Sequence, residues 1–355
     1  MKEAIKELFD AWLEKETDDF SGVLSATGVD GVIHQQTFGF RNKVEELLNE
    51  TDTAFGIASG TKLFTGLAVC KLIDSGKLSL GDKLYDLLPC DLGQIDKGVT
   101  VYQLLTHTSG VGDYIDEDVE DFDEQLAALY KKYPSHNWLN MDYYLQMTSP
   151  LAPKFAPGED YSYSNSGYVL LGLVIEAVSG KSYQQFVADE IIKPCGLTHT
   201  GFYRSDALPN NAAIGYMHDE ESDEWNTNAE SIPILGGSDG GIYSCSADMD
   251  KLWRAVFGNK VLSDEMTALF LKSHEIIEED DEDGSVESYG LGVYKYTVGD
   301  KYFHFVIGID SGVGFCSAYY PATQVVVSAF SNTGETAFYD LMCGCMEIFS
   351  SNKFE

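Results

Sequence analysis

Residues 54–76 read AFGIASGTKLFTGLAVCKLIDSG, and they contain the helix around which the rest of the fold is predicted to assemble. The run after Ser59 is mostly apolar and ends at Asp74-Ser75-Gly76, which is a typical helix stop. This pattern predicts a buried helix, yet Lys62 lies near its beginning. Residues three apart on a helix share a face, so the Lys62 amine is expected within reach of the Ser59 hydroxyl.

Ser59 and Lys62 together predict nucleophilic catalysis. A serine hydroxyl is a poor nucleophile unless a base takes its proton, and burial lowers the pKa of a lysine so that it can be that base. The positive end of the helix favours an oxyanion beside Ser59. The spacing alone is weak evidence, because Ser350 and Lys353 repeat it in a polar tail that no apolar helix follows.

A second element is Tyr163-Ser164-Asn165, in a loop rich in Ser, Tyr and Asn just before the apolar run 166–178. Tyr163 could relay or accept a proton beside a lysine. Asn165 could donate to a substrate carbonyl or orient Lys62. The alternative is structural: the tyrosine packs on the start of the next helix, and Asn or Ser caps it.

Strand patterns occupy both ends of the chain, and helical patterns occupy the middle. Short turns between consecutive strands predict antiparallel pairing. The expected fold class is α+β: an antiparallel sheet from both termini flanked by helices, plus a mainly helical lobe. We expect a sheet domain at 1–75 and 285–355, a helical lobe at 76–284, and an active site in the cleft between them. Strands are predicted at 20–25, 32–40, 289–297, 301–306, 314–320 and 324–330, and terminal helices at the N-terminus and at 337–349.

Composition narrows the function classes. The chain has 355 residues and a net charge of −34, which disfavours nucleic acid and anionic membrane surfaces as partners. No apolar run reaches the roughly 20 residues of a membrane span, and the N-terminus has no secretory pattern. Seven scattered cysteines do not indicate a disulfide framework. A cytoplasmic protein is expected, with no metal site and no cofactor, and with the acidic run 278–283 as a solvated loop.

Several segments in order resemble one known family, the serine β-lactamase-related and penicillin-recognising hydrolases. The resemblance is to the branch with class C β-lactamases, D-alanyl carboxypeptidases and related esterases, and it covers about residues 20 to 335. Residues 57–89 are similar to the nucleophile helix of that family and the segment after it. Three further segments are similar to family segments: LLTHTSG (104–110), FAPGEDYSYSNSGYVLLGLVIEAVSGKSYQQFV (155–187) and GGIYSCSADM (240–249).

The resemblance implies a β-lactamase/transpeptidase-like fold and a role for each matched residue. Ser59 would be the acylating nucleophile, and its backbone N–H would be one oxyanion donor. Lys62 would be the base or proton partner of Ser59. Tyr163 would help to activate Ser59 or the deacylating water, and Asn165 would contact the substrate amide. The second oxyanion donor would be a backbone N–H of a facing strand, with Ile309 and Ser311 as candidates.

The chain departs from the family in the third motif, which is Lys or His, a small residue and Gly on the strand facing the serine. By order this element should lie within 305–317, where Val306 or Gly308 would take the cationic position. His199-Thr200-Gly201 has the right letters but lies in a different segment. His304 is interpreted as a strand residue, and His107 as a structural loop residue. The chain lacks this Lys or His and has the acidic Asp310 nearby. Both features argue against strong binding of the negatively charged carboxylate of a penicillin.

Three functions stay open at this point. The first is a metal-independent serine hydrolase that forms an acyl-enzyme on Ser59, with β-lactams, D-amino-acid peptides or carboxylic esters as substrates. The second is a non-catalytic, penicillin-binding-like sensor that kept the fold and lost turnover. The third is a carboxylesterase without β-lactam activity. The expected partner is a small amide or ester, and the sequence does not reveal the oligomeric state.

Overall fold

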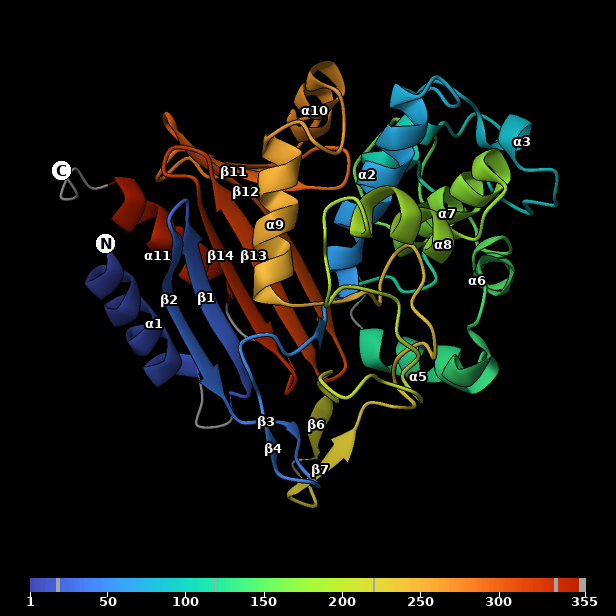
Figure 1. Cartoon of the computed structure of the whole chain (residues 1–355). Helices are drawn as coiled ribbons and strands as arrows, with labels where there is room; N and C mark the ends of the chain where they lie inside the picture. Colours follow the sequence, from blue (N-terminus) through green and yellow to red (C-terminus); the bar gives the residue numbers. More distant parts are fainter. Residues whose placement is uncertain (17–19, 118, 120, 220, 335–337, 351–355) are drawn as a thin grey trace.

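Strands from both ends of the chain pair in one antiparallel sheet of eight strands, so that prediction is confirmed (Figure 1). The computed structural model describes residues 1–16, 20–117, 119, 121–219, 221–334 and 338–350. The sheet order is β2-β1-β14-β13-β12-β11-β10-β9. Its strands are β1 (Gly22–Gly28), β2 (Gly31–Phe38), β9 (Glu275–Glu279), β10 (Ser285–Tyr289), β11 (Tyr294–Val298), β12 (Lys301–Asp310), β13 (Val313–Tyr320) and β14 (Val325–Ser331).

The sheet is covered on both faces, and β14 shows how the sequence achieves this. All seven residues of β14 are buried, because successive side chains point to opposite faces. Val327 and Ala329 pack toward the terminal helices α1 (Lys2–Glu16) and α11 (Phe338–Ser350). Val326 and Phe330 pack into the other core, toward the helical part of the chain. Figure 1 shows α1 and α11 side by side beyond one face of the sheet, and α9 (Ser246–Phe257) on the opposite face.

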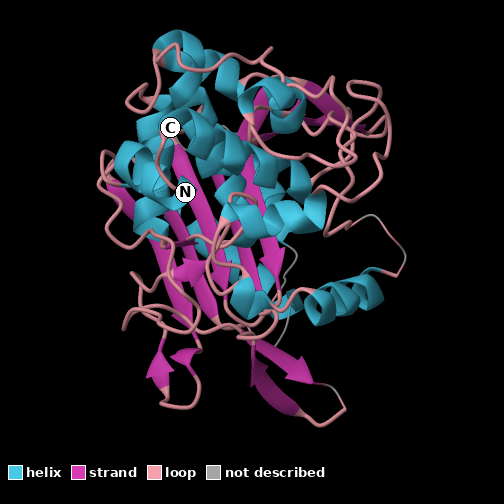
Figure 2. Cartoon of the chain, turned by 90° about the vertical axis from the view of Figure 1, so that its right-hand side faces the viewer, coloured by secondary structure: helices cyan, strands magenta, loops and turns pink. Residues whose placement is uncertain are grey.

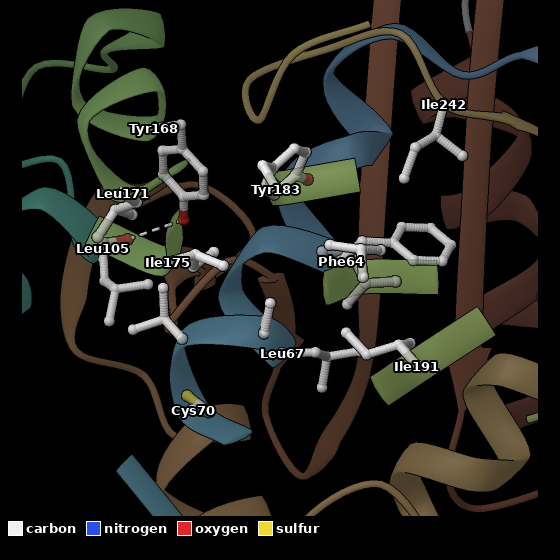
Figure 3. Packing of buried hydrophobic residues seen from close by; sticks show 14 of the residues in the cluster. Phe64, Leu67, Cys70, Leu105, Tyr168, Leu171, Ile175, Tyr183, Ile191 and Ile242 are labelled. Carbon is white, nitrogen blue, oxygen red and sulfur yellow. Dashed lines mark hydrogen bonds between the residues drawn. The ribbon is translucent and has the colours of Figure 1, made fainter. Parts of the chain in front are cut away.

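The helical part is arranged around α2 (Thr61–Asp74), whose residues are nearly all buried. Its apolar side chains meet α7 (Asn165–Ser179) and α8 (Tyr183–Val187), as Figure 3 shows for Phe64 and Leu67. The view in Figure 2 shows the long strands running beside one another with helices packed over them. The other helices are α3 (Leu84–Leu87), α4 (Val101–Leu105), α5 (Phe122–Lys132), α6 (Met141–Thr148) and α10 (Asp264–Leu271), with short turns η1 (Ala58–Gly60), η2 (Ser135–Asn137) and η3 (Ala188–Ile192).

Several predicted boundaries are wrong. The single strand expected over 289–297 is two strands, because β10 ends at Tyr289 and the chain turns through Gly290 and Gly292 before β11. β9 was not predicted, and it takes Glu278 and Glu279 out of the expected solvated loop. Its acidic, exposed side chains hide the strand pattern, and charges on an edge strand oppose pairing with other chains. The strand expected to continue to Phe40 stops at Phe38, because Gly39 has φ +66°.

The remaining strands form three two-stranded ladders. They are β3 (Phe40–Asn42) with β4 (Leu47–Leu48), β5 (Phe55–Gly56) with β8 (Tyr243–Ser244), and β6 (Tyr216–Asp219) with β7 (Glu224–Thr227). Both α9 and β9 come from the range assigned to the helical lobe, yet they pack on or join the main sheet. The two-domain division and the cellular location stay predictions. Among the described residues, no helix combines the length and hydropathy that crossing a membrane requires.

Candidate active site

Ser59 lies in the short turn η1, directly before α2. The helix expected from Ser59 therefore begins two residues later, at Thr61. Ala58 has φ +41°, a conformation that is costly for a residue with a side chain and that recurs at functional sites. This turn places the Ser59 side chain at the N-terminal end of α2, where the backbone N–H groups of the first helical turn have no partner within the helix.

Lys62 points back from the first turn of α2 and is held by three oxygen atoms. Its Nζ donates to Ser59 Oγ at 2.9 Å, to Asn165 Oδ1 at 2.7 Å and to the Asp239 carbonyl at 2.8 Å. The side chain is only 2% exposed. Burial lowers the pKa of Lys62, although the carboxylates of Asp239, Glu117 and nearby acids act in the opposite direction. The amine is therefore easier to deprotonate than an ordinary lysine.

Tyr163 completes this group from the loop before α7. Its hydroxyl interacts with the Ser59 side chain, and its ring centre is 4.8 Å from Lys62 Nζ. Burial raises the pKa of Tyr163 well above its usual value, so this phenol keeps its proton. The structure thus brings together Ser59, Lys62, Tyr163 and Asn165, the four side chains to which the resemblance assigns roles. Ser164 caps α7 by accepting from the Gly167 N–H, as the structural alternative expected of this loop.

Asp113 fixes the position of Asn165 and was not predicted from the sequence. Its two carboxylate oxygens accept the backbone N–H groups of Asn165 and Ser166 at 2.8 and 2.9 Å, at the N-terminus of α7. Burial raises the pKa of Asp113 to about 7. Nothing in the local sequence distinguishes Asp113 from the many other acids of this chain, because its partners lie some 50 residues away.

We expect Asp113→Asn to lower the acylation rate about tenfold and to reduce stability by ~1–3 kcal/mol. An amide can accept only one of the two N–H groups and turns its own NH₂ toward the other, which leaves a buried donor unpaired. Single-turnover acylation and thermal unfolding would measure the two effects. Asp281→Asn, in the exposed turn between β9 and β10, is the control and should change neither. An Asp113→Asn protein equal to wild type in both assays would contradict this role.

β12 supplies the strand that faces Ser59. A Cβ atom on Gly308 would lie 2.1 Å from the Ile57 carbonyl oxygen and 2.9 Å from the Ser59 nitrogen, so the two backbones touch here. Gly308 therefore takes the glycine position of the third motif, in contact with η1, which we call the serine turn. Val306, two residues earlier on the same face of β12, then takes the position where the family has a cation. Val306 is buried in the apolar core.

The two candidates for the second oxyanion donor differ. The Ser311 N–H already donates to Asp310 Oδ1 at 2.8 Å, so it is engaged. Ile309 follows Gly308 directly and is 53% exposed. β11 pairs with β12 only as far as Phe305, so the free edge of β12 at Ile309 faces the serine turn. The geometry therefore favours the backbone N–H of Ile309.

Two cavities meet at Ser59. The first, of about 440 Å³, contains Asp239, Asp310 and an apolar wall that includes Phe122, Tyr130 and Trp138. The second, of about 500 Å³, is lined by Tyr163, Glu287, Ile307 and other residues. Ser59, Glu117 and Ile309 line both. Among the described residues, no Lys, Arg or His side chain lines either cavity.

His107, His199 and His304 line neither cavity. The His107 ring is buried among tyrosines, and its Nδ1 accepts the Ser164 N–H at 3.0 Å. Thr200 bonds Ser244 and Asp248 and does not belong to β12, the strand that faces Ser59. His304 Nε2 contacts the Leu271 carbonyl at 3.0 Å. Lys353 of the second S-x-x-K match lies outside the described residues.

One group of side chains has metal-ligand chemistry, but its atoms are already in use. The ligand atoms of His199, Cys245 and Asp248 lie within 4.8 Å of one another. The Asp248 carboxylate, however, accepts bonds from Lys251 Nζ and from the His199 N–H. Burial raises the pKa of the Cys245 thiol to about 11, which opposes the thiolate that a metal needs. All seven cysteines of the chain are free thiols.

A family model described as β-lactamase matches residues 9–343. The chain belongs to the β-lactamase family. It is 31% identical to penicillin-binding protein 4* of Bacillus subtilis over 270 residues, which are 73% of this chain and 56% of that protein. This β-lactamase-family chain thus spans little more than half the length of that relative.

Solved structures agree with this assignment. A penicillin binding protein from Bacillus halodurans superposes with a TM-score of 0.85 at 35% identity, over 97% of this chain and 99% of that one. A D-stereospecific amidohydrolase from Streptomyces sp. shares the fold, with a TM-score of 0.79 at 22% identity over 96% and 97% of the two chains. The predicted family and the β-lactamase/transpeptidase-like α+β fold are therefore confirmed.

Proposed function

We propose that this β-lactamase-family hydrolase works through an acyl-enzyme on Ser59, with Lys62 as the base. The observation that carries the proposal is the 2.9 Å contact between Lys62 Nζ and Ser59 Oγ in a buried setting that lowers the pKa of Lys62. A neutral amine at this distance can take the hydroxyl proton as Oγ bonds to the substrate carbonyl carbon. The backbone N–H groups of Ser59 and Ile309 would stabilise the oxyanion.

The remaining proton transfers follow from the same contacts. When the tetrahedral intermediate collapses, the C=O bond re-forms and the bond to the leaving group breaks. The leaving group needs a proton, which Tyr163 donates and then regains from protonated Lys62. Water then attacks the acyl-enzyme carbonyl carbon and gives a proton to Lys62. When this second tetrahedral intermediate collapses, the bond between Ser59 Oγ and the acyl carbon breaks, and Lys62 returns the proton to Ser59 Oγ. The raised pKa of Tyr163 favours this donor role over a role as a tyrosinate base.

The acylation rate should increase with pH through the lowered pKa of Lys62 and then level off. Protonated Lys62 cannot accept the Ser59 proton, so the rate is lost as the pH falls below that pKa. Asp113 and Asp310, whose pKa values burial raises to about 7, interact with Lys62, so the observed midpoint belongs to the group and not to one residue. Lys62→Arg keeps its charge at every pH and should show no such increase, with acylation lowered ~100-fold or more.

The measurement is pre-steady-state acylation by a nitrophenyl ester from pH 5 to pH 10, with buffer hydrolysis subtracted. A wild-type rate that is flat with pH, or a Lys62→Arg profile that keeps the wild-type increase, would exclude Lys62 as the base.

The missing cation at Val306 favours substrates without a carboxylate, and it also motivates the alternative of a sensor without turnover. A fluorescent penicillin, a fluorophosphonate, a chromogenic cephalosporin and a short-chain nitrophenyl ester distinguish these functions. Turnover of the ester alone indicates a carboxylesterase without β-lactam activity. Labelling of Ser59 by penicillin without turnover of any substrate indicates the sensor. The absence of any labelling or hydrolysis that depends on Ser59 would end the proposal.

A further inference from the structure

The charged side chains around Ser59 are mostly acidic. Lys62 interacts with four carboxyl groups, those of Asp113, Glu117, Asp239 and Asp310. Three of these acids line the first cavity, and no basic side chain lines it among the described residues. A substrate carboxylate in this cavity would meet like charges in a poorly hydrated space, whereas a cation would meet opposite charges.

Among the described residues, the carboxyl groups of Asp310 and Glu117 each accept one hydrogen bond, and Asp310 is the one that lies on the strand facing Ser59. Asp239 is bonded by the Tyr114 hydroxyl, and Glu117 accepts from Asn165 Nδ2 at 3.0 Å. Asp113 is engaged with the N-terminus of α7. Within the described residues, the Asp310 carboxyl group accepts one hydrogen bond, from its neighbour Ser311 N–H. Its position is also specific, because it follows Ile309 on the strand that faces Ser59.

Under the proposed function, the two cavities would hold the two sides of the scissile bond. Tyr163 lines the second cavity and not the first, so a leaving group that takes its proton from Tyr163 belongs in the second. The acyl part of the substrate then enters the first cavity. There it meets Asp310, which follows Ile309 on β12, and the apolar wall that includes Tyr130 and Trp138.

We infer that the acyl part of the substrate carries an ammonium group close to the scissile carbonyl, and that Asp310 binds it. This inference rests on the proposed function. The substrate class is then an amide or ester of an amino acid with a free amine and an apolar or aromatic side chain. Burial and the neighbouring acids raise the pKa of Asp310 to about 7 in the empty site, and a bound cation would favour the ionised form.

Three ethyl esters that differ at one position test the inference at pH 7. They are phenylalanine ethyl ester as each enantiomer, ethyl 2-methyl-3-phenylpropanoate with a methyl group in place of the ammonium, and monoethyl benzylmalonate with a carboxylate there. We expect wild-type kcat/KM to be at least ~10-fold higher for one enantiomer of the ammonium ester than for the methyl ester, the scale of one charged hydrogen bond.

Two variants then assign the effect to Asp310. Asp310→Asn should reduce the preference for the ammonium ester to about threefold or less, measured as the ratio of kcat/KM for the ammonium and methyl esters within that variant. Asp310→Lys should reverse the order in favour of the carboxylate ester, a gain that a misfolded protein cannot show. Asp281→Asn should keep the wild-type order. Equal wild-type hydrolysis of the ammonium and methyl esters, or an unchanged ratio in Asp310→Asn, would overturn the inference.

Binding separates this inference from the proposed function. In a Ser59→Ala background, phenylalanine ethyl ester should change the fluorescence of the protein through Trp138 in the first cavity. The methyl ester should bind at least ~10-fold more weakly, and the added Asp310→Asn change should abolish the difference. If no ester is hydrolysed but this binding difference is present, the proposed function fails and the cation site stands. If binding does not discriminate, the cation site is excluded whatever the hydrolysis.

Discussion

Ser59→Ala is expected to abolish covalent labelling and to lower ester turnover by ~10⁴-fold or more. The nucleophile, its base and its orienting groups act as one unit, so loss of the nucleophile removes nearly the whole chemical contribution. The fold should survive, because Lys62 Nζ keeps its bonds to Asn165 and to the Asp239 carbonyl. We therefore expect the free energy of unfolding to change by no more than ~1 kcal/mol.

The chain contains its own control for this experiment. Ser350 has the same three-residue spacing to a lysine as Ser59 but lies at the end of α11, on the terminal-helix side of the sheet. Ser350→Ala should be labelled at the wild-type rate. Mass spectrometry of the labelled wild-type peptide locates the adduct. An adduct on a residue other than Ser59, or full labelling of Ser59→Ala, would show that the nucleophile is elsewhere.

Gly308→Ala adds only one carbon atom, yet it is expected to damage both the fold and the site. The new Cβ would lie 2.1 Å from the Ile57 carbonyl oxygen and 2.9 Å from the nitrogens of Ser59 and Gly60. These are backbone atoms of two packed segments, so β12 and the serine turn must separate. We expect a loss of stability of ~3 kcal/mol or more and a large loss of acylation, because Ser59 and Ile309 would no longer share one oxyanion site.

Chemical denaturation and single-turnover acylation at a temperature where the variant is folded would measure the two effects separately. Gly81→Ala is the matched control, since a Cβ there would meet no atom within 4 Å and its φ is not positive. It should stay within ~0.5 kcal/mol of wild type. A Gly308→Ala protein with normal stability and acylation would show that the contact with the serine turn is not needed.

The sequence predicted the elements with strong periodicity and missed those without it. β13 and β14 were predicted closely, because their residues are almost entirely apolar and buried on both faces. β9 was missed because Glu278 and Glu279 belong to an exposed edge strand, where no buried side produces an alternating pattern. The break between β10 and β11 was missed because glycines are also found within strands, so Gly290 and Gly292 do not by themselves mark a strand end.

In the site, contacts between residues close in sequence could be predicted, whereas contacts between residues far apart in sequence mostly could not. Ser59 and Lys62 are one helical turn apart, so their contact could be predicted from spacing alone. Asn165 reaches Lys62 across 103 positions, and the residue types alone offered this contact as only one of several roles for Asn165. Asp113 had no such signal, since its role depends on where the loop before α5 crosses the start of α7. The choice between Ile309 and Ser311 required knowing that the Ser311 N–H is already bonded.

The pairing of β1 with β14 has a consequence for the order of events during synthesis. A ribosome delivers β1 and β2 first, but the neighbour of β1 in the sheet arrives only near the end of translation. β12 is also synthesised late. The turn that contains Ser59 and the helix α2 are therefore synthesised long before the strand that completes the oxyanion site. Such distant pairing slows folding and leaves an open strand edge on the nascent chain. The site around Ser59 can therefore be completed only after β12 to β14 have emerged.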